Sequence, residues 1–135
     1  RDEYLALAQR TQADFENFRK RMARDVRAAE SRGIAKVVKE ILPALDTLEL
    51  ALQAAGEGEV ADGFKLVRNE FLAALARVGI EPYSPEGEPF DPSVHEAMSQ
   101  QPFDGVATGT VASVYQQGYR IDGTVLRPAR VVVAA

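Results

Sequence analysis

The sequence predicts an α+β protein in which a long N-terminal helix and two shorter helices precede a small all-β domain. Residues 1–42 contain no proline, whereas residues 79–128 contain six of the seven prolines. Because proline interrupts helices and marks turns, we expect helices first and short strands last. The chain is therefore divided into a long dimerising helix (1–42), a helix hairpin of a four-helix bundle (43–79) and a C-terminal β domain (80–135).

The composition excludes several classes of protein. A hydrophobic fraction of 46% and a charged fraction of 27% over 135 residues are typical of one globular domain and argue against pervasive disorder. The chain has no cysteine and one histidine, which excludes disulfides, thiolate chemistry and a multi-histidine metal centre. The net charge of −4 argues against general binding to polyanions. We expect no metal, no cofactor and no membrane span.

The start of the chain and its lack of cysteine bear on where the protein works. No signal peptide follows Arg1, and a start at arginine suggests a trimmed N-terminus. The absence of cysteine fits a reducing compartment. We expect a cytoplasmic protein of bacterial type, with the mitochondrial matrix and the plastid left open.

The first forty residues are predicted to form one long helix with a narrow apolar stripe. The strongest repeat has a period of eleven residues, at Tyr4, Phe15, Val26 and Val37, or about 3.67 residues per turn. A narrow stripe on a charged helix needs a second helix to cover it, and we expect the same helix of a second chain. The predicted dimerisation residues are Tyr4, Phe15, Phe18, Met22, Val26 and Val37 in this helix, and Leu45, Leu48, Leu52, Phe71 and Leu75 in the hairpin.

The middle of the chain predicts two shorter helices. Pro43 is placed in the first turn of a new helix, where its missing N–H costs nothing. A second helix is expected from about residue 60 to 78, with Gly79 as its C-terminal stop. Its apolar residues Phe64, Val67, Phe71, Leu72, Leu75 and Val78 are expected to lie inside. Two such hairpins would build a four-helix bundle.

The last part of the chain predicts a small β domain. Strands are expected at residues 80–83, 109–117, 119–121, 125–127 and 130–134. The dipeptide Asp122-Gly123 predicts a tight hairpin turn. Alternation of Val111, Ser113 and Tyr115 with their neighbours predicts one covered face.

Few residues could support catalysis or ligand binding. His95 could pair with Asp91 and with Ser93 or Ser99, but no nucleophile elbow surrounds them, so a structural role at a turn and strand entry is favoured. The carboxylates of Asp46 and Glu49 could flank a metal or a sugar, and a solvated helix face is the favoured interpretation.

A basic cluster in the long helix raises the possibility of nucleic-acid binding. The run Arg19-Lys20-Arg21 is followed by further arginines, as in a basic-zipper helix. No heptad zipper follows it, and acidic residues interrupt the positive field. A solvated face and a protein-docking surface are therefore both preferred to a nucleic-acid site.

Five segments in order resemble the GrpE family, the nucleotide-exchange factors of DnaK-type chaperones. The segments lie within residues 12–21, 42–52, 63–79, 90–98 and 117–133, and they include Asn17-Phe18-Arg19-Lys20-Arg21, Leu42-Pro43-Ala44-Leu45-Asp46, Phe90-Asp91-Pro92 and Leu126-Arg127-Pro128-Ala129. Each segment is weak alone, and their order along the chain makes the resemblance specific.

The resemblance implies a homodimer that is not an enzyme and binds no nucleotide itself. It implies paired parallel long helices, a four-helix bundle, and a grip on the ATPase domain of a DnaK-type chaperone that promotes ADP release, with heat modulation through the long helices. By motif position it places Arg19, Gly63, Tyr115 and Val133 at the chaperone contact, with core packing as the alternative for Tyr115 and Val133. Two other functions stay open: a coiled-coil scaffold without exchange activity, and a nucleic-acid binder that uses the basic cluster.

Overall fold

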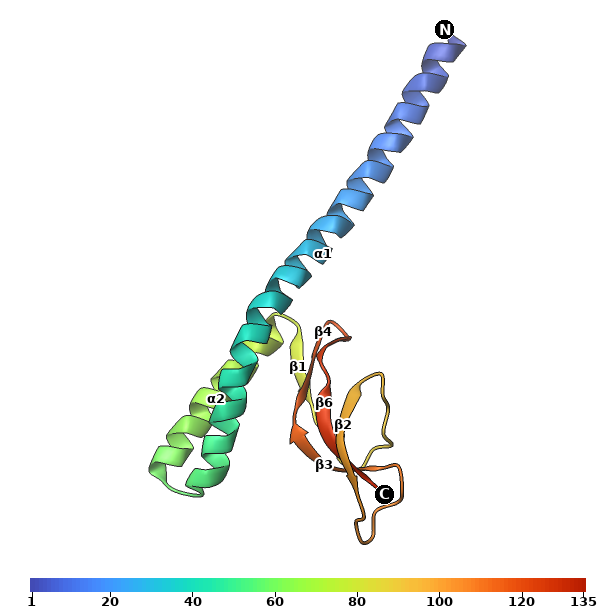
Figure 1. Ribbon diagram of the computed structural model, residues 1–135. Coiled ribbons are helices and arrows are strands. Elements are labelled where there is room, and N and C mark those ends of the chain that lie inside the picture. The colour runs from blue at the N-terminus through green and yellow to red at the C-terminus, as the bar shows by residue number, and fades with distance from the viewer. The chain divides into compact units, whose positions relative to one another are not determined.

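The computed structural model describes residues 1–135 as two helices followed by six strands, which confirms the predicted α+β class (Figure 1). The helices are α1 (Asp2–Ala55) and α2 (Glu59–Arg77). The strands are β1 (Ile80–Tyr83), β2 (His95–Gln101), β3 (Val111–Gln116), β4 (Gly118–Ile121), β5 (Thr124–Arg127) and β6 (Ala129–Ala134). The chain divides into two compact units, Arg1–Lys36 and Val37–Ala135. Neither helix combines the length and the apolar character that a membrane span requires.

α1 continues through Pro43, so the prediction that a new helix begins there is wrong. Proline removes one backbone hydrogen bond and crowds the preceding turn. Burial holds the helix together at this point, since Leu42 and Leu45, on either side of the proline, are buried. Tertiary packing therefore overrides the local preference for a helix boundary.

The unit Arg1–Lys36 is helical from Asp2 onward, and its apolar stripe is uncovered. All of the large apolar side chains in its first 26 residues are exposed: Tyr4, Leu5, Leu7, Phe15, Phe18, Met22 and Val26. The stripe predicted from the eleven-residue repeat is thus available to a partner.

In the second unit, the end of α1 and α2 form the expected hairpin. The two helices are joined through Gly56 and Gly58, which both have positive φ, and Gly79 (φ 84°) follows α2 as predicted. Four hairpin side chains are buried within the single chain: Leu45, Leu52, Ala61 and Leu75. Phe64, Val67, Phe71 and Val78 were expected inside, but they are about half exposed because no element of this chain covers them.

The strands form two three-stranded sheets, in the orders β1-β4-β5 and β2-β6-β3. β6 is the central strand of the second sheet and pairs parallel with β2 and antiparallel with β3. Its core consists of four buried residues, Val111, Ala129, Val131 and Val133. The prediction located five strands and missed β2, whose pairing partner β6 lies far along the chain.

Two local features shape the strands. Asp122 (φ 47°) and Gly123 (φ 82°) form the β4–β5 turn, both in the left-handed region that the predicted tight hairpin requires. The pairing of β3 with β6 shifts register twice. Val111 and Val114 therefore both pack against the core while Tyr115 is exposed, so burial in β3 does not follow the simple alternation on which the prediction of one covered face was based.

The two sheets are joined by the side chain of Tyr83. Its hydroxyl donates to the Val94 carbonyl and accepts a hydrogen bond of 3.2 Å from the Ala129 amide. A strand of the first sheet is thereby fixed to the start of β6 in the second sheet.

Candidate docking surface

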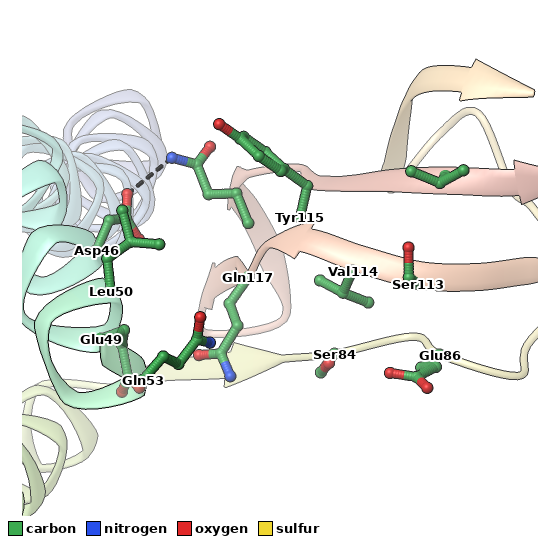
Figure 2. Close-up of a pocket in the computed structure, with 12 residues that line it drawn as sticks. Asp46, Glu49, Leu50, Gln53, Ser84, Glu86, Ser113, Val114, Tyr115 and Gln117 are labelled. Carbon is green, nitrogen blue, oxygen red and sulfur yellow. Dashed lines mark hydrogen bonds between the residues drawn. The ribbon is translucent and has the colours of Figure 1, made fainter. Parts of the chain in front are cut away.

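An open groove of about 580 Å³ separates the end of α1 from the β strands (Figure 2). Asp46, Glu49, Leu50 and Gln53 line it from α1, and Ser84 and Glu86 line it from the segment after β1. The opposite wall is formed by residues 113–117 and by Val132. The side chains come from four separate stretches of the chain, so the groove exists only in the folded unit Val37–Ala135.

The lining of this groove is mostly polar, with two exposed apolar side chains, and its charged groups are acidic. Tyr115 is 70% exposed and Leu50 is 63% exposed. The three charged residues of the lining, Asp46, Glu49 and Glu86, are all carboxylates. Exposed aromatic and aliphatic side chains of this kind are suited to binding a protein surface.

Asp46 is bound to the β strands by two side chains. Arg127 forms a bidentate ion pair with it, Nη1 to Oδ2 over 2.6 Å and Nη2 to Oδ1 over 2.9 Å. The Gln116 amide donates to Asp46 Oδ2 over 2.8 Å, as Figure 2 shows. Arg127 Nη2 also donates to the Gln117 carbonyl over 2.7 Å. Asp46 and Arg127 side chains are only 22% and 18% exposed, so this pair is well shielded from water.

Glu49 is bound in the other direction, toward α2. Its carboxylate pairs with Arg68 over 3.4 Å. The prediction that Asp46 and Glu49 lie on a solvated helix face is therefore wrong, because both are partly buried and paired. The alternative of a metal or sugar site also finds no support, since both carboxylates are already paired with arginine side chains. No group of three or more histidine, aspartate or glutamate side chains in residues 1–135 is placed to hold a metal.

His95 has the structural role that the sequence favoured. Its side chain is buried, and Nδ1 accepts a hydrogen bond of 3.0 Å from the Asp91 amide. Asp91 Oδ1 accepts from the Ser93 hydroxyl and amide, over 2.7 and 2.9 Å. These two hydrogen bonds lower the pKa of Asp91 below its ordinary value of 3.8. The aspartate is thus occupied by the turn and does not orient the histidine for proton transfer.

The four residues predicted at the chaperone contact differ in accessibility. Arg19 is exposed on α1, and Gly63 is exposed on α2 with open space where a Cβ would lie. Tyr115 projects at the groove. Val133 is 2% exposed within the β core, which favours the core-packing alternative. The groove contains Tyr115 but neither Gly63 nor Val133.

The interaction of Asp46 with Arg127 was not predicted from the sequence. Both residues lie in segments that carry the family resemblance, but 81 positions separate them. No local period or spacing signals such a pair.

The chain thus combines a helix hairpin with a small β unit, residues 80–135, and the two meet along an open, partly apolar groove. The model of the GrpE family matches residues 1–135. The chain belongs to the GrpE family.

Individual relatives support the same assignment. Protein GrpE of Legionella pneumophila (strain Corby) is 41% identical over 128 residues, which cover 93% of this chain and 64% of that protein. Protein GrpE of Stenotrophomonas maltophilia (strain R551-3) is 40% identical over 136 residues, covering 99% of this chain and 80% of the relative. Protein GrpE of Thermus thermophilus is 40% identical over 135 residues, covering 98% and 72%. The chain thus spans just under two thirds of the length of its Legionella relatives.

Proposed function

We propose that this chain is a nucleotide-exchange factor that binds the ATPase domain of a DnaK-type chaperone and promotes release of ADP. The observation that carries the proposal is the family match over all 135 residues. In this role the protein catalyses no chemical reaction. It binds no free nucleotide and acts by stabilising the open nucleotide cleft of its partner.

The mechanism is a reciprocal coupling between two ligands of the chaperone. If the exchange factor weakens ADP binding by a given factor, ADP weakens binding of the exchange factor by the same factor. A tenfold effect requires a preference of about 1.4 kcal/mol for the open form. Contacts on the open ATPase domain are sufficient to supply that preference without touching the nucleotide.

We assign the chaperone contact to accessible residues of both helices and of the β unit. Arg19, Gly63 and Tyr115 are exposed and can meet a partner directly. Gly63 offers bare backbone, which allows another chain to approach closely. Val133 contributes by supporting the strand behind the contact, since its own side chain is buried.

The active form is proposed to be a homodimer. Residues 1–42 serve as the dimerising helix, residues 43–79 as the hairpin of a four-helix bundle, and residues 80–135 as the docking β domain. The exposed stripe of the first unit and the half-exposed Phe64, Val67 and Phe71 of α2 are the apolar surfaces that a second chain would cover. Leu45, Leu52 and Leu75 are buried in the hairpin, so they support this interface from behind.

Light scattering tests the dimer. The protein should have twice the mass of one chain, and Val26→Asn in the stripe should weaken the association. The neighbouring Arg27→Asn, outside the stripe, is the matched control. A monomer at micromolar concentration would refute the homodimer.

Release of a fluorescent ADP analogue from a DnaK-type chaperone tests the exchange activity. The protein should accelerate release, while calorimetry with the isolated protein detects no ATP or ADP binding. Binding to the chaperone without acceleration would instead indicate a scaffold. If the protein shifts nucleic acid in a gel at physiological salt, binding of nucleic acid through the basic cluster at Arg19-Lys20-Arg21 would be favoured instead.

A further inference from the structure

The ion pair between Asp46 and Arg127 connects the helix hairpin to the β strands, two parts of the second unit that follow one another in the chain through one short link. α2 ends at Arg77 and β1 begins at Ile80, with Gly79 between them. The Asp122 amide donates to the Gly79 carbonyl over 3.0 Å, so the tip of the β4–β5 hairpin lies at this same link. This hydrogen bond lies at the end of α2 and does not involve α1.

Asp46 supplies a second attachment on a different helix. It lies on α1, and its two partners lie at the ends of β3 and β5. Arg127 also donates to the Gln117 carbonyl, between β3 and β4. One carboxylate therefore binds the first sheet through Arg127 and the second sheet through Gln116. Two attachments on different helices fix the orientation of the strands relative to the hairpin.

The geometry of the contact favours one orientation. A bidentate arginine–carboxylate pair constrains direction as well as distance, because two parallel N–H···O bonds must form together. The guanidinium also lies 5.1 Å from the centre of the buried Tyr119 ring, which limits its alternatives. Tyr115 immediately precedes Gln116, so the contact that binds Asp46 also places the exposed tyrosine of the groove.

We infer that Asp46 is a positioning residue, which holds the β unit at the angle to the helix hairpin that lets Tyr115 and the hairpin engage one partner together. This inference rests on the proposed function, in which the chaperone contacts both the hairpin at Gly63 and the β unit at Tyr115. A partner that grips two surfaces loses affinity when their relative position must be ordered on binding. Asp46 itself need not touch the partner.

Distance measurements on the isolated protein test the positioning directly. The chain contains no cysteine, so spin labels at two introduced cysteines, Ala54→Cys on α1 and Gln100→Cys on β2, report without background. Labelled chain is diluted into an excess of unlabelled chain so that distances within one chain are measured. The expected result is a narrow distance distribution in the otherwise unchanged protein and a broad one with Asp46→Asn. Arg127→Gln should broaden it equally, and the double variant should be no broader than either single variant.

Chaperone binding tests whether the position matters. Asp46→Asn should lower affinity on the order of tenfold while the far-ultraviolet circular dichroism is unchanged. Glu96→Gln is the matched control, because it breaks an exposed ion pair with Arg130 inside the second sheet. It should alter neither the distance distribution nor the affinity.

The outcomes separate this inference from the proposed function. If the unchanged protein fails to accelerate ADP release, the proposed function is wrong, whatever the distances are. If the unchanged protein is active but Asp46→Asn leaves the distance distribution narrow, Asp46 does not position the β unit. A broad distribution with full affinity would also overturn the inference, because the fixed angle would then be irrelevant to docking.

Discussion

A side-chain carbon added at Gly118 would lie 2.2 Å from Cζ of Tyr83. The two residues are opposite each other in the pairing of β1 with β4, and the tyrosine ring lies across the glycine. The ring cannot move aside without loss, because its hydroxyl bonds to Val94 and Ala129 and the Arg120 guanidinium lies 4.1 Å from its centre. The absence of a side chain at Gly118 thus leaves room for the Tyr83 ring, which joins the two sheets.

Gly118→Ala should therefore destabilise the β unit. The expected loss in the free energy of unfolding is about 1–3 kcal/mol, the usual cost of overpacking. Chemical denaturation followed by near-ultraviolet circular dichroism measures it. Gly63→Ala is the matched control, because a Cβ there meets nothing within 4 Å and alanine favours a helix. Equal stability of the Gly118 variant and the unchanged protein would contradict the role given to Tyr83.

Tyr119 should make stability fall at alkaline pH. Burial raises the pKa of Tyr119 from 10.0 to about 12, aided by the carboxylates of Asp46 and Glu49 and opposed by Arg127. A raised pKa means that the folded state favours the neutral phenol, so this contribution is complete below about pH 10 and is lost as the pH rises toward about 12. The loss should be about 2 kcal/mol.

Denaturation of the unchanged protein and of Tyr119→Phe at several pH values from 9 to about 12 measures this effect. Phenylalanine cannot ionise, so the variant should lose less stability than the unchanged protein over the same interval. Parallel pH profiles would show that Tyr119 is not the group responsible.

Tyr115→Ala should weaken chaperone binding without affecting folding. The side chain is largely exposed, so its loss leaves no cavity, and an aromatic anchor in an interface contributes on the order of 1–3 kcal/mol. Titration of a labelled chaperone measures the affinity. Met98→Ala, on β2 outside the groove, removes another exposed apolar side chain and should have no effect. Equal affinities of the Tyr115→Ala variant and the unchanged protein for the chaperone would show that Tyr115 is not part of the contact.

Gly63→Asp should weaken chaperone binding and leave the association of chains unchanged. Open space surrounds the missing Cβ within this chain, so the folded protein should accept the new side chain. Binding should be obstructed instead, because the chaperone would meet a new carboxylate at the place where it approaches the backbone of Gly63. Binding and light scattering are measured on the same samples, with Gly63→Ala as the smaller change. A variant that binds normally would exclude a close approach at this position.

Gly33→Ala should raise the temperature at which the long helix melts. Gly33 lies inside α1 with open space around it, and alanine stabilises a helix interior by about 1 kcal/mol relative to glycine. Few apolar contacts hold this part of the chain, so we expect it to melt before the β unit. Circular dichroism during heating, with an exchange assay at the same temperatures, measures both effects. Loss of all structure in one step would contradict this expectation.

Local chemistry explains which elements the sequence could predict. Asp122-Gly123 specified its turn because both residues tolerate positive φ, and Gly79 marked the end of α2 for the same reason. β2 was missed because its side chains are mostly exposed and polar, so no alternation reveals it. The helix through Pro43 was missed because burial of Leu42 and Leu45 decides it, and burial depends on distant strands and helices.

The candidate site was predictable only in part. Tyr115 was predicted from its place in the family resemblance, and its exposure follows two register shifts that no period in the sequence indicates. The paired state of Asp46 depends on residues 70 and 81 positions away. For Val133 the sequence left docking and core packing open, and its burial follows from the position of β6 in the middle of its sheet.

The central position of β6 also determines when the second sheet can form during synthesis and when it is lost on proteolysis. β2 and β3 pair with β6 and not with each other, so neither has a partner in its sheet until residues 129–134 have left the ribosome. The backbone hydrogen bonds of both helices, in contrast, join residues that emerge earlier. A protease that removes the residues from Ala129 onward would likewise disrupt the whole second sheet, because β2 and β3 would both lose their pairing partner. Gln116, at the end of β3, would then no longer be held beside Asp46.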